Sequence, residues 1–291
     1  MKGRIVKGVA GFYYVSAGDK TYECKARGIF RKDRKKPLVG DLCEIEIIDE
    51  KEPTGNITLI YPRKNELIRP NVANIDQALI VFAIKHPDPN FVMLDKLIIQ
   101  YEKQDIPVII AINKDDLSDE EEMRFIGDIY RGSGCRLIFT SAREKDGIDE
   151  LESLLKDKTT SVAGPSGVGK SSLINCLLQD DSLKTGEISK KTERGKHTTR
   201  HSEIIPVSEN AFIMDTPGFS SFDVYDIGPE DAALYYREFD MRESCRFVPC
   251  SHTHEPGCLI KEAVEKGQIS RIRYENYLAI YNELKAGQGR H

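Results

Sequence analysis

A glycine-rich stretch near the middle of the chain has the residue types of a phosphate-binding loop. It fits the pattern G-x-x-x-x-G-K-[ST], in which backbone N–H groups surround nucleotide phosphates, the lysine reaches the β and γ oxygens, and the serine holds Mg²⁺. Glycines let the backbone approach an anion, and a helix that begins at the lysine points its partial positive charge at the phosphates. The stretch consists of Gly164, Pro165, Ser166, Gly167, Val168, Gly169, Lys170, Ser171 and Ser172.

The segments on either side of this loop have the composition that its chemistry needs. Residues 160–163 are typical of a strand that enters the loop, and residues 172–178 are typical of a helix that leaves it. A strand, a glycine-rich loop and a helix are the structural context in which this pattern binds a nucleotide. We therefore expect a nucleotide with its Mg²⁺ at this position.

A second motif predicts which base the nucleotide carries. Asn113, Lys114, Asp115 and Asp116 follow an apolar run and have the form N-K-x-D. A carboxylate at the last position can accept both the ring N–H and the exocyclic amine of guanine, and adenine has neither donor there. An orphaned buried polar group costs ~1–3 kcal/mol, which is enough to separate the two bases. We expect Asn113 to brace the loops and Lys114 to lie along the base plane.

A third short motif follows the next predicted strand. Ser141 and Ala142 come directly after the apolar residues 137–139. At the end of a strand, this dipeptide can offer a backbone N–H to guanine O6. Because it is expected on the same sheet as the N-K-x-D motif, the two motifs together predict a guanine site.

Two segments after the phosphate loop are candidates for the γ-phosphate and its metal. A long polar stretch contains a threonine that can ligate Mg²⁺ and sense the γ-phosphate, and Thr198 and Thr199 are equal candidates. Residues 211–214 then predict a strand that ends at Asp215. Asp215 would hold the metal through water, and the N–H of Gly218 would meet the γ-phosphate.

A cluster of cysteines and histidines near the end of the chain has the residue types of a zinc site. Cys245, Cys250 and Cys258, together with His252 or His254, fall within a short segment. Three thiolates and one imidazole can close a tetrahedral site with no open position, which makes such a zinc structural. The remaining cysteines have no such neighbours, and we expect them to be small core residues: Cys24, Cys43, Cys135 and Cys176.

The composition is that of an ordinary globular protein with two or three domains. The chain has 291 residues, of which 40% are hydrophobic and 31% are charged. No apolar run approaches the roughly 18 residues that a membrane helix needs, and the N-terminus lacks a secretory signal. We therefore expect a cytoplasmic protein whose cysteines are thiols or metal ligands.

The charge is distributed unevenly along the chain. The net charge is −5, although the first 36 residues contain eleven Lys and Arg against three Asp and Glu. A basic end on an acidic protein suggests a polyanionic partner. A solvated basic loop is an equal alternative, especially for residues 31–36.

The basic first part of the chain has the pattern of a small β-barrel. Residues 12–15, 21–26, 43–47 and 57–60 are rich in aromatic and β-branched residues and are separated by turn formers. Four or five such strands fit a barrel of the OB type, whose open face binds oligonucleotides. Tyr13, Tyr14 and Tyr22 can stack on RNA bases, although they can equally be core or rim aromatics, which is expected of at least one of them.

From about residue 71, predicted strands alternate with predicted helices. Apolar runs at 77–83 and 107–112 fit buried parallel strands, and residues 94–101 and 123–130 carry apolar side chains at helical spacing. A further helix is expected after Asp146. The alternation predicts a parallel sheet with helices on both faces.

The order of the motifs is unusual. In the usual GTPase the phosphate loop comes first, whereas here Asn113 and Ser141 precede Gly164 and Asp215. With this permuted order, the chain resembles the RsgA family, also called YjeQ or YloQ, which comprises bacterial GTPases of small-ribosomal-subunit assembly. The likeness covers nearly the whole chain, including residues 195–199, residues 215–219 and the cysteine-rich end.

The resemblance implies a multidomain fold. An OB-like, RNA-binding β-barrel is expected at 1–68, a circularly permuted α/β P-loop GTPase domain at 69–222, and a mainly helical zinc-binding domain at 223–291. It also implies the zinc ligand set Cys245, Cys250, His252 and Cys258. At the end of the chain, an apolar stripe is expected to pack a helix on the zinc domain, with Arg271 and Arg273 elsewhere.

The resemblance also implies an activity. It implies Mg²⁺-dependent hydrolysis of GTP to GDP in late assembly of the 30S subunit, with binding to rRNA and stimulation by the subunit. The alternative is a GTP-dependent RNA-binding module in which hydrolysis is incidental. We expect a monomer. We also expect that it does not act at membranes, because no lipidation motif is present.

One catalytic group is missing from the pattern. Many GTPases place a water-orienting glutamine after Gly218, but this chain has Phe219, whose side chain forms no conventional hydrogen bond. Intrinsic hydrolysis should therefore be slow. His197 is our candidate to orient water once the ribosomal subunit orders its loop. The alternative is an exposed histidine with no catalytic part.

Overall fold

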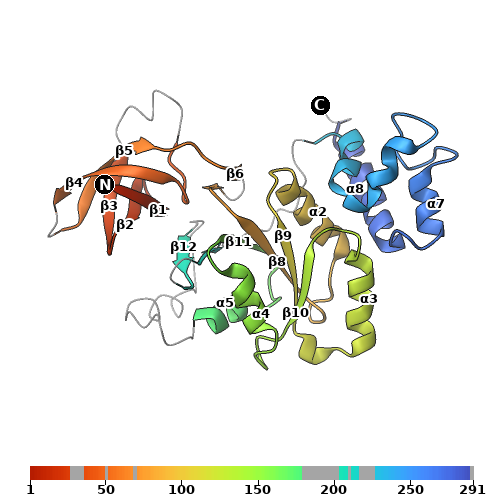
Figure 1. Cartoon of the computed structure of the whole chain (residues 1–291), viewed down its shortest axis with the longest axis horizontal. Helices are drawn as coiled ribbons and strands as arrows, with labels where there is room; N and C mark the ends of the chain where they lie inside the picture. Colours follow the sequence, from red (N-terminus) through yellow and green to blue (C-terminus); the bar gives the residue numbers. More distant parts are fainter. Residues whose placement is uncertain are drawn as a thin grey trace. The chain divides into compact units, whose positions relative to one another are not determined.

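The computed structural model describes residues 1–26, 36–49, 52–67, 71–178, 203–208, 211–215 and 227–288. The chain divides into two compact units, each of which is assembled from three segments. The first unit comprises Met1–Gln77, Glu152–Val162 and Leu177–Phe219. The second unit comprises Ala78–Leu151, Ala163–Cys176 and Ser220–His291. Figure 1 labels the helices and strands.

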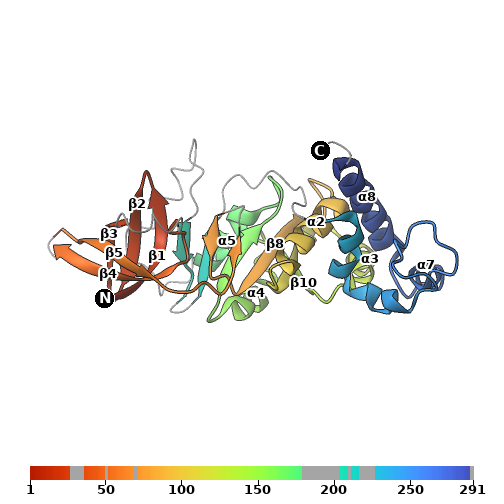
Figure 2. The same cartoon turned by 90° about the horizontal axis from the view of Figure 1, so that it is seen from above.

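The first unit begins with a closed five-stranded barrel. Its strands are hydrogen-bonded in the order β1-β2-β3-β5-β4, and pairing of β1 with β4 closes the barrel (Figures 1 and 2). Only the β3–β5 pairing is parallel. The strands are β1 (Lys2–Val9), β2 (Phe12–Ala17), β3 (Lys20–Ala26), β4 (Leu42–Asp49) and β5 (Thr54–Ile60).

The barrel interior is filled by alternate residues of its strands. Ile5, Val15, Cys24, Cys43 and Ile57 are completely buried. Their neighbours along each strand are more exposed, as expected where one face of a sheet packs on a core and the other faces solvent. The two buried cysteines therefore act as small apolar core residues, as predicted.

The first unit also contains three strands from later in the chain. β11 (Thr159–Ala163) pairs in parallel with β13 (Phe212–Asp215), and β12 (Glu203–Pro206) pairs with β13 in the antiparallel direction. β12 also pairs with β1 of the barrel. The short strands β6 (Glu66–Leu67) and β7 (Val72–Ala73) form a separate hairpin.

The second unit contains three parallel strands in the order β10-β9-β8. β8 (Gln77–Ala83) and β9 (Val108–Asn113) are buried along their whole length, because continuous apolar runs suit strands that are covered on both faces. β10 (Arg136–Thr140) lies at the edge of these three. Parallel strands end at the same edge of a sheet, so the residues that follow β9 and β10 lie side by side.

Helices connect these strands, and two of them begin at side-chain caps. Asn90 caps α2, and Asp119 forms a capping box with Glu122 at the start of α3. The helices are α2 (Phe91–Glu102), α3 (Glu120–Tyr130), α4 (Ile148–Leu155) and α5 (Lys170–Leu178), with a short 3₁₀ turn η1 (Asp115–Leu117) after β9.

The last part of the second unit is helical. It consists of the 3₁₀ segments η3 (Pro229–Tyr235) and η4 (Arg237–Ser244) and the helices α7 (Leu259–Glu265) and α8 (Arg271–Gln288). Its core contains the rings of Tyr236, Phe239 and Tyr277. The predicted stripe on α8 packs against this core, as expected.

Most predicted elements are present, and the core placement expected for two cysteines was wrong. β1 and β12 were not predicted. Tyr22 is 5% exposed and belongs to the core, as expected of at least one of the three tyrosines, whereas Tyr13 and Tyr14 are partly exposed. Cys135 and Cys176 are only half-buried, so they are not core residues. No helix within the described ranges combines the length and apolar character needed to cross a membrane.

Candidate nucleotide site and metal centre

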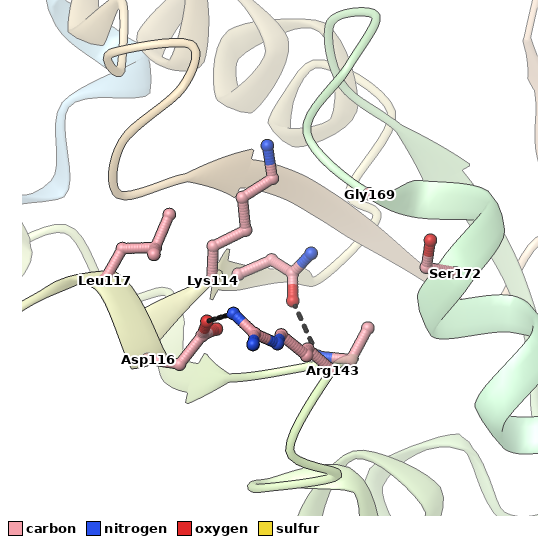
Figure 3. A pocket seen from close by; sticks show the side chains of 8 residues that line it. Lys114, Asp116, Leu117, Arg143, Gly169 and Ser172 are labelled. Carbon is pink, nitrogen blue, oxygen red and sulfur yellow. Dashed lines mark hydrogen bonds and ion pairs between the residues drawn. The ribbon is translucent and has the colours of Figure 1, made fainter.

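Three loops of the second unit meet around one cavity. The cavity has a volume of about 330 Å³ and lies where β9 ends, β10 ends and α5 begins. Figure 3 shows its lining side chains, which come from all three loops. They are Asn113, Lys114, Asp116, Leu117, Ala142, Arg143, Gly169 and Ser172. The N-K-x-D motif, the Ser-Ala dipeptide and the glycine-rich loop therefore lie together.

Asn113 joins the three loops. It is the last residue of β9, and only 1% of its surface is exposed. Its Nδ2 donates to the carbonyl of Val168 over 2.8 Å, and its Oδ1 accepts from the Ala142 N–H over 3.2 Å. Gly169 has φ +95°, and an added Cβ there would lie 2.2 Å from Asn113 Nδ2. The glycine is needed because the side chain of Asn113 occupies the space beside it.

Ser141 orients the carboxylate of Asp116. The Ser141 hydroxyl donates to Asp116 Oδ1 over 2.7 Å, and Asp116 Oδ2 lies 3.9 Å from Arg143 Nη1 (Figure 3 shows the pair of Asp116 and Arg143). The side chain of Asp116 is 14% exposed. A carboxylate has about four lone-pair sites, so Asp116 can still accept two parallel N–H donors. This arrangement matches the N1 and N2 edge of guanine.

The Ala142 peptide is held from both sides. Its N–H, which the sequence predicts as the donor to guanine O6, donates to Asn113 Oδ1, so a base would share this N–H with Asn113. The thiol of Cys176 on α5 donates to the Ala142 carbonyl over 3.3 Å. Sequence reasoning missed this second contact, because Cys176 lies one turn beyond the glycine-rich pattern.

Lys114 has an uncommon backbone conformation. Its φ is +65°, in the left-handed region that costs a non-glycine residue roughly 1 kcal/mol or more. Its ammonium group donates to the carbonyls of Gly167 (2.9 Å) and His86. The stem of Lys114 thus spans the space between its own loop after β9 and the carbonyls of His86 and Gly167. The neighbouring Asp115 does not line the cavity, and its pKa is raised by burial and by the carboxylates of Asp146 and Asp116.

The glycine-rich loop folds back on its own lysine. Lys170 is the first residue of α5, and its ammonium donates to the carbonyls of Gly164 (2.8 Å) and Pro165 (2.6 Å). Gly164 has φ +139°, and an added Cβ would lie 2.1 Å from the Val81 carbonyl oxygen. Ser171 and Ser172 are exposed in the first turn of α5. The loop therefore presents a lysine, two hydroxyls and a helix N-terminus together.

Some predicted residues are not covered by this geometry. His197, Thr198, Thr199 and Gly218 lie outside the described residues. Asp215 is the last residue of β13, which fixes the position of its backbone only. The roles predicted for these residues remain predictions.

The predicted zinc ligands form one cluster. The ligand atoms of Cys245, Cys250, His252 and Cys258 all lie within 4.8 Å of one another. His252 is buried, and its Nδ1 lies 3.4 Å from Cys258 Sγ, whereas His254 is exposed. Burial raises the pKa of Cys250 to about 12, so its ionisation needs a cation close by. Three sulfurs and one nitrogen fit a closed tetrahedral zinc site.

Helix α8 and one carboxylate hold the loop that carries His252. The hydroxyl of Tyr274 donates to the His252 carbonyl (2.8 Å), and that of Tyr277 donates to the Ser251 carbonyl (2.6 Å). The Glu255 carboxylate accepts hydrogen bonds from the backbone and hydroxyl of Ser251. Burial opposes the ionisation of Glu255, but these hydrogen bonds lower its pKa to about 2. The sequence had assigned the tyrosines to packing alone.

A buried ion pair docks α8 on α2. Arg273 is 1% exposed, which corrects the expectation that it lies away from the packed face of the helix. Its Nη1 lies 2.5 Å from Asp95 Oδ1, and its Nε donates to Glu238 over 2.7 Å. Its guanidinium lies over the rings of Tyr130 and Tyr236. Arg273 is therefore unavailable for contacts with RNA.

Comparison with known proteins finds relatives that match this chain over nearly its whole length. Family models match the RsgA N-terminal domain at residues 2–56 and the RsgA GTPase at residues 60–225. A small ribosomal subunit biogenesis GTPase RsgA from Agathobacter rectalis is 52% identical and covers 99% of both chains. The protein of the same name from Caldanaerobacter subterraneus subsp. tengcongensis is 48% identical and covers 100% of this chain and 98% of its own.

Solved structures agree with the sequence comparisons. The crystal structure of YjeQ from Thermotoga maritima has a TM-score of 0.83 at 36% identity, covering 97% of this chain and 98% of that chain. YloQ, described as a circularly permuted GTPase, has a TM-score of 0.79 at 36% identity, covering 98% of this chain and 95% of that chain. The resemblance and the permuted fold inferred from the motif order are thus confirmed. The chain belongs to the RsgA family of circularly permuted GTPases.

Proposed function

We propose that this GTPase uses Mg²⁺ to hydrolyse GTP during late assembly of the small (30S) ribosomal subunit, bound to its rRNA. One observation carries the nucleotide part: Asp116, oriented by Ser141, lines the cavity that is also lined by Gly169 and Ser172 at the end of the phosphate loop. The ribosomal part is supported by the names of the relatives, which are small ribosomal subunit biogenesis GTPases. The proposed location is the cytoplasm, where bacterial ribosomal subunits are made.

The proposed base recognition follows from the cavity. Asp116 accepts the N1 and N2 hydrogens of guanine, and Lys114 lies along the base. The Ala142 N–H reaches guanine O6 while Asn113 braces the loops. Adenine would leave Asp116 without matching donors in a partly buried site, which costs ~1–3 kcal/mol per orphaned group.

The proposed phosphate recognition uses the N-terminus of α5. Lys170 leaves the loop carbonyls that it now contacts and binds the β and γ oxygens, while the backbone N–H groups of the loop bind the remaining phosphate oxygens. Ser171, Thr198 or Thr199, and Asp215 through water are proposed to hold Mg²⁺, which neutralises charge on the phosphates. The Gly218 N–H is proposed to meet the γ-phosphate.

The proposed catalytic step is the attack of water on the γ-phosphate. Phe219 stands where many GTPases have a glutamine that orients the water. A neutral imidazole at His197 accepts a hydrogen bond from water, and we propose that the 30S subunit orders the loop that carries it. Turnover by the protein alone is then slow.

The three proposed domains have separate roles. The barrel at 1–68 binds rRNA, the domain at 69–222 hydrolyses GTP, and the domain at 223–291 is built around one structural zinc at Cys245, Cys250, His252 and Cys258. The chain acts as a monomer on the subunit. The clustering of three thiols, two of them buried, around a buried imidazole supports the metal part of this proposal.

Kinetics and binding test the proposal together. Multiple-turnover GTP hydrolysis is measured with the protein alone and with purified 30S subunits, and binding to the subunits is measured with GTP and with GDP. We expect slow intrinsic turnover, clear stimulation by the subunit, and tighter binding with GTP. Lys170→Ala is the control for contaminating GTPases. Binding to 30S that is equal with GTP and GDP, together with unstimulated turnover, would reject the ribosomal role.

A further inference from the structure

Strand β1 links the barrel to strands that come much later in the chain. The first residues of β1 pair with β4, whereas Lys7 pairs with Glu203 of β12. The register of β1 against β2 shifts between Ile5 and Lys7, which marks a bulge, and bulges bend a strand toward new partners. β12 pairs in turn with β13, so hydrogen-bonded pairing runs from the barrel to the strand that ends at Asp215.

Arg4 makes a second link at the other end of β13. Its Nη1 donates to the Thr159 hydroxyl over 2.8 Å, and its guanidinium carbon lies 5.1 Å from the centre of the Phe212 ring. Thr159 and Phe212 are paired neighbours, and each is the first residue of its strand. A planar guanidinium can donate at its edge and stack with its face, which an ammonium group cannot do. One barrel side chain therefore holds the start of both strands.

The residue that Arg4 contacts is itself fixed. The Thr159 N–H donates to Asp76 Oδ2 over 2.8 Å, and the Thr159 carbonyl accepts from the Asp76 N–H over 2.9 Å. The Phe212 N–H donates to the Lys158 carbonyl over 2.9 Å. Arg4 thus joins the barrel to a rigid pair of strands rather than to a loose loop.

A close backbone approach makes a third link. Gly40 has φ +97°, and an added Cβ would lie 1.9 Å from the Ala73 carbonyl oxygen and 2.8 Å from the end of the Met214 side chain. The Gly40 N–H donates to the Ile5 carbonyl over 2.8 Å. Met214 directly precedes Asp215, so the barrel contacts β13 at both its start and its end.

We propose that Arg4 is a positioning residue for GTP hydrolysis, which holds β13 and hence Asp215 in a fixed relation to the barrel. The inference rests on the proposed function for the metal-holding role of Asp215 and for the binding of rRNA by the barrel. Asp215 lies three residue steps beyond Phe212, which is about 10 Å along a strand. A displacement of the barrel on RNA is therefore carried to Asp215 by paired strands, which are stiff compared with a loop.

The test removes the Arg4 contact from either side. Arg4→Ala removes both the hydrogen bond and the stacking, and Thr159→Val removes only the accepting hydroxyl. Thr159→Ser keeps that hydroxyl and serves as the rescue variant. Thr58→Val is the matched control, because its hydroxyl donates within the barrel, to the Glu44 carbonyl (3.2 Å). For each variant, GTP affinity, 30S affinity, basal kcat and subunit-stimulated kcat are measured.

The expected pattern separates positioning from binding. In Arg4→Ala and Thr159→Val, stimulated kcat falls about tenfold, whereas basal kcat and both affinities change less than about twofold. Thr159→Ser and Thr58→Val behave like the unchanged protein. Stimulated kcat that survives both changes, or that falls only in proportion to 30S affinity, overturns the role of Arg4. If 30S subunits fail to stimulate the protein without any substitution, the proposed function is rejected instead.

A measurement without ribosomes tests the positioning alone. Hydrogen exchange of the backbone amides of β12 and β13 is followed in the full-length protein. We expect faster exchange in Arg4→Ala and Thr159→Val than in Thr58→Val, because both lose the hydrogen bond between the barrel and the start of the paired strands β11 and β13. Arg4→Ala also loses the contact with the Phe212 ring and should exchange faster than Thr159→Val. Equal protection in all three variants overturns the inference even if turnover is affected.

Discussion

The hydroxyl of Ser141 donates to Asp116 Oδ1 over 2.7 Å and so turns the carboxylate toward the cavity. Asp116→Asn replaces one acceptor oxygen by a donor, which opposes the guanine N–H groups and suits xanthine. We expect GTP binding to weaken by roughly 10- to 100-fold and xanthosine triphosphate to become the preferred nucleotide. Competition binding with both nucleotides measures this. A variant that still prefers GTP would show that Asp116 does not recognise the base.

The cluster at Cys245, Cys250, His252 and Cys258 predicts one equivalent of metal. Protein purified without chelator should contain about one zinc per chain, and Cys250→Ser should lose it, because a closed site needs all four ligands. The helical end should then unfold at a lower temperature. Cys135→Ser, which changes a thiol outside the cluster, is the control. Elemental analysis that finds no zinc in the unchanged protein rejects the site.

The hydroxyl of Tyr277 predicts an effect on metal retention without any change of a ligand. Tyr277→Phe leaves the Ser251 carbonyl without its 2.6 Å partner and loosens the loop that carries His252. Outer hydrogen bonds of this kind typically change metal affinity by about 10-fold or more. Competition with a chromogenic chelator measures the loss. Tyr281→Phe, four residues further along α8, should keep its zinc. Equal release from both variants would contradict the role of the Tyr277 hydrogen bond in metal retention.

The buried pair of Arg273 and Asp95 predicts a large effect on stability. Arg273→Met leaves Asp95 and Glu238 buried without their counter-charge, which should cost about 3–5 kcal/mol in the free energy of unfolding. The double variant Asp95→Asn with Arg273→Met should lose less than the sum of the single variants. Lys96→Ala breaks a pair with the more exposed Glu283 between the same helices, and should cost about 1 kcal/mol or less.

Urea unfolding of the second unit within the full-length variants distinguishes a stabilising ion pair from one that contributes nothing. If Arg273→Met unfolds with the same midpoint as Lys96→Ala, the ion pair does not stabilise the docking of α8 on α2. A double variant whose loss equals the sum of the single losses would show that the two charges do not interact.

His197 predicts a loss confined to the stimulated reaction. His197→Ala should keep its affinity for GTP and for 30S, but should lose about 100-fold in subunit-stimulated kcat, since a positioned proton acceptor contributes on that scale. His254→Ala changes an exposed histidine of the metal loop and is the control. Stimulated turnover that survives His197→Ala would assign water orientation to rRNA or to another residue.

The sequence alone was sufficient to predict which motifs meet at the site. Asn113, Asp116, Ser141 and Lys170 occur in short motifs whose spacing follows from local backbone geometry, and each motif ends a strand or begins a helix. Parallel strands end at one edge of a sheet, so motifs at strand ends meet without further information. The permuted order of these motifs was also visible in the sequence, and it was sufficient to indicate the family.

The tertiary structure decided which side chains the chain buries and how strands from distant segments pair. Arg273 was expected on an exposed face, because its charge gives no local sign of Asp95 and Glu238, which come from other elements. β1 was missed because lysines and glycines dilute its pattern, and its pairing with β12 joins segments almost 200 residues apart. Periodicity predicts local structure, but long-range pairing depends on which surfaces exclude water together. That information appears only when the chain is folded.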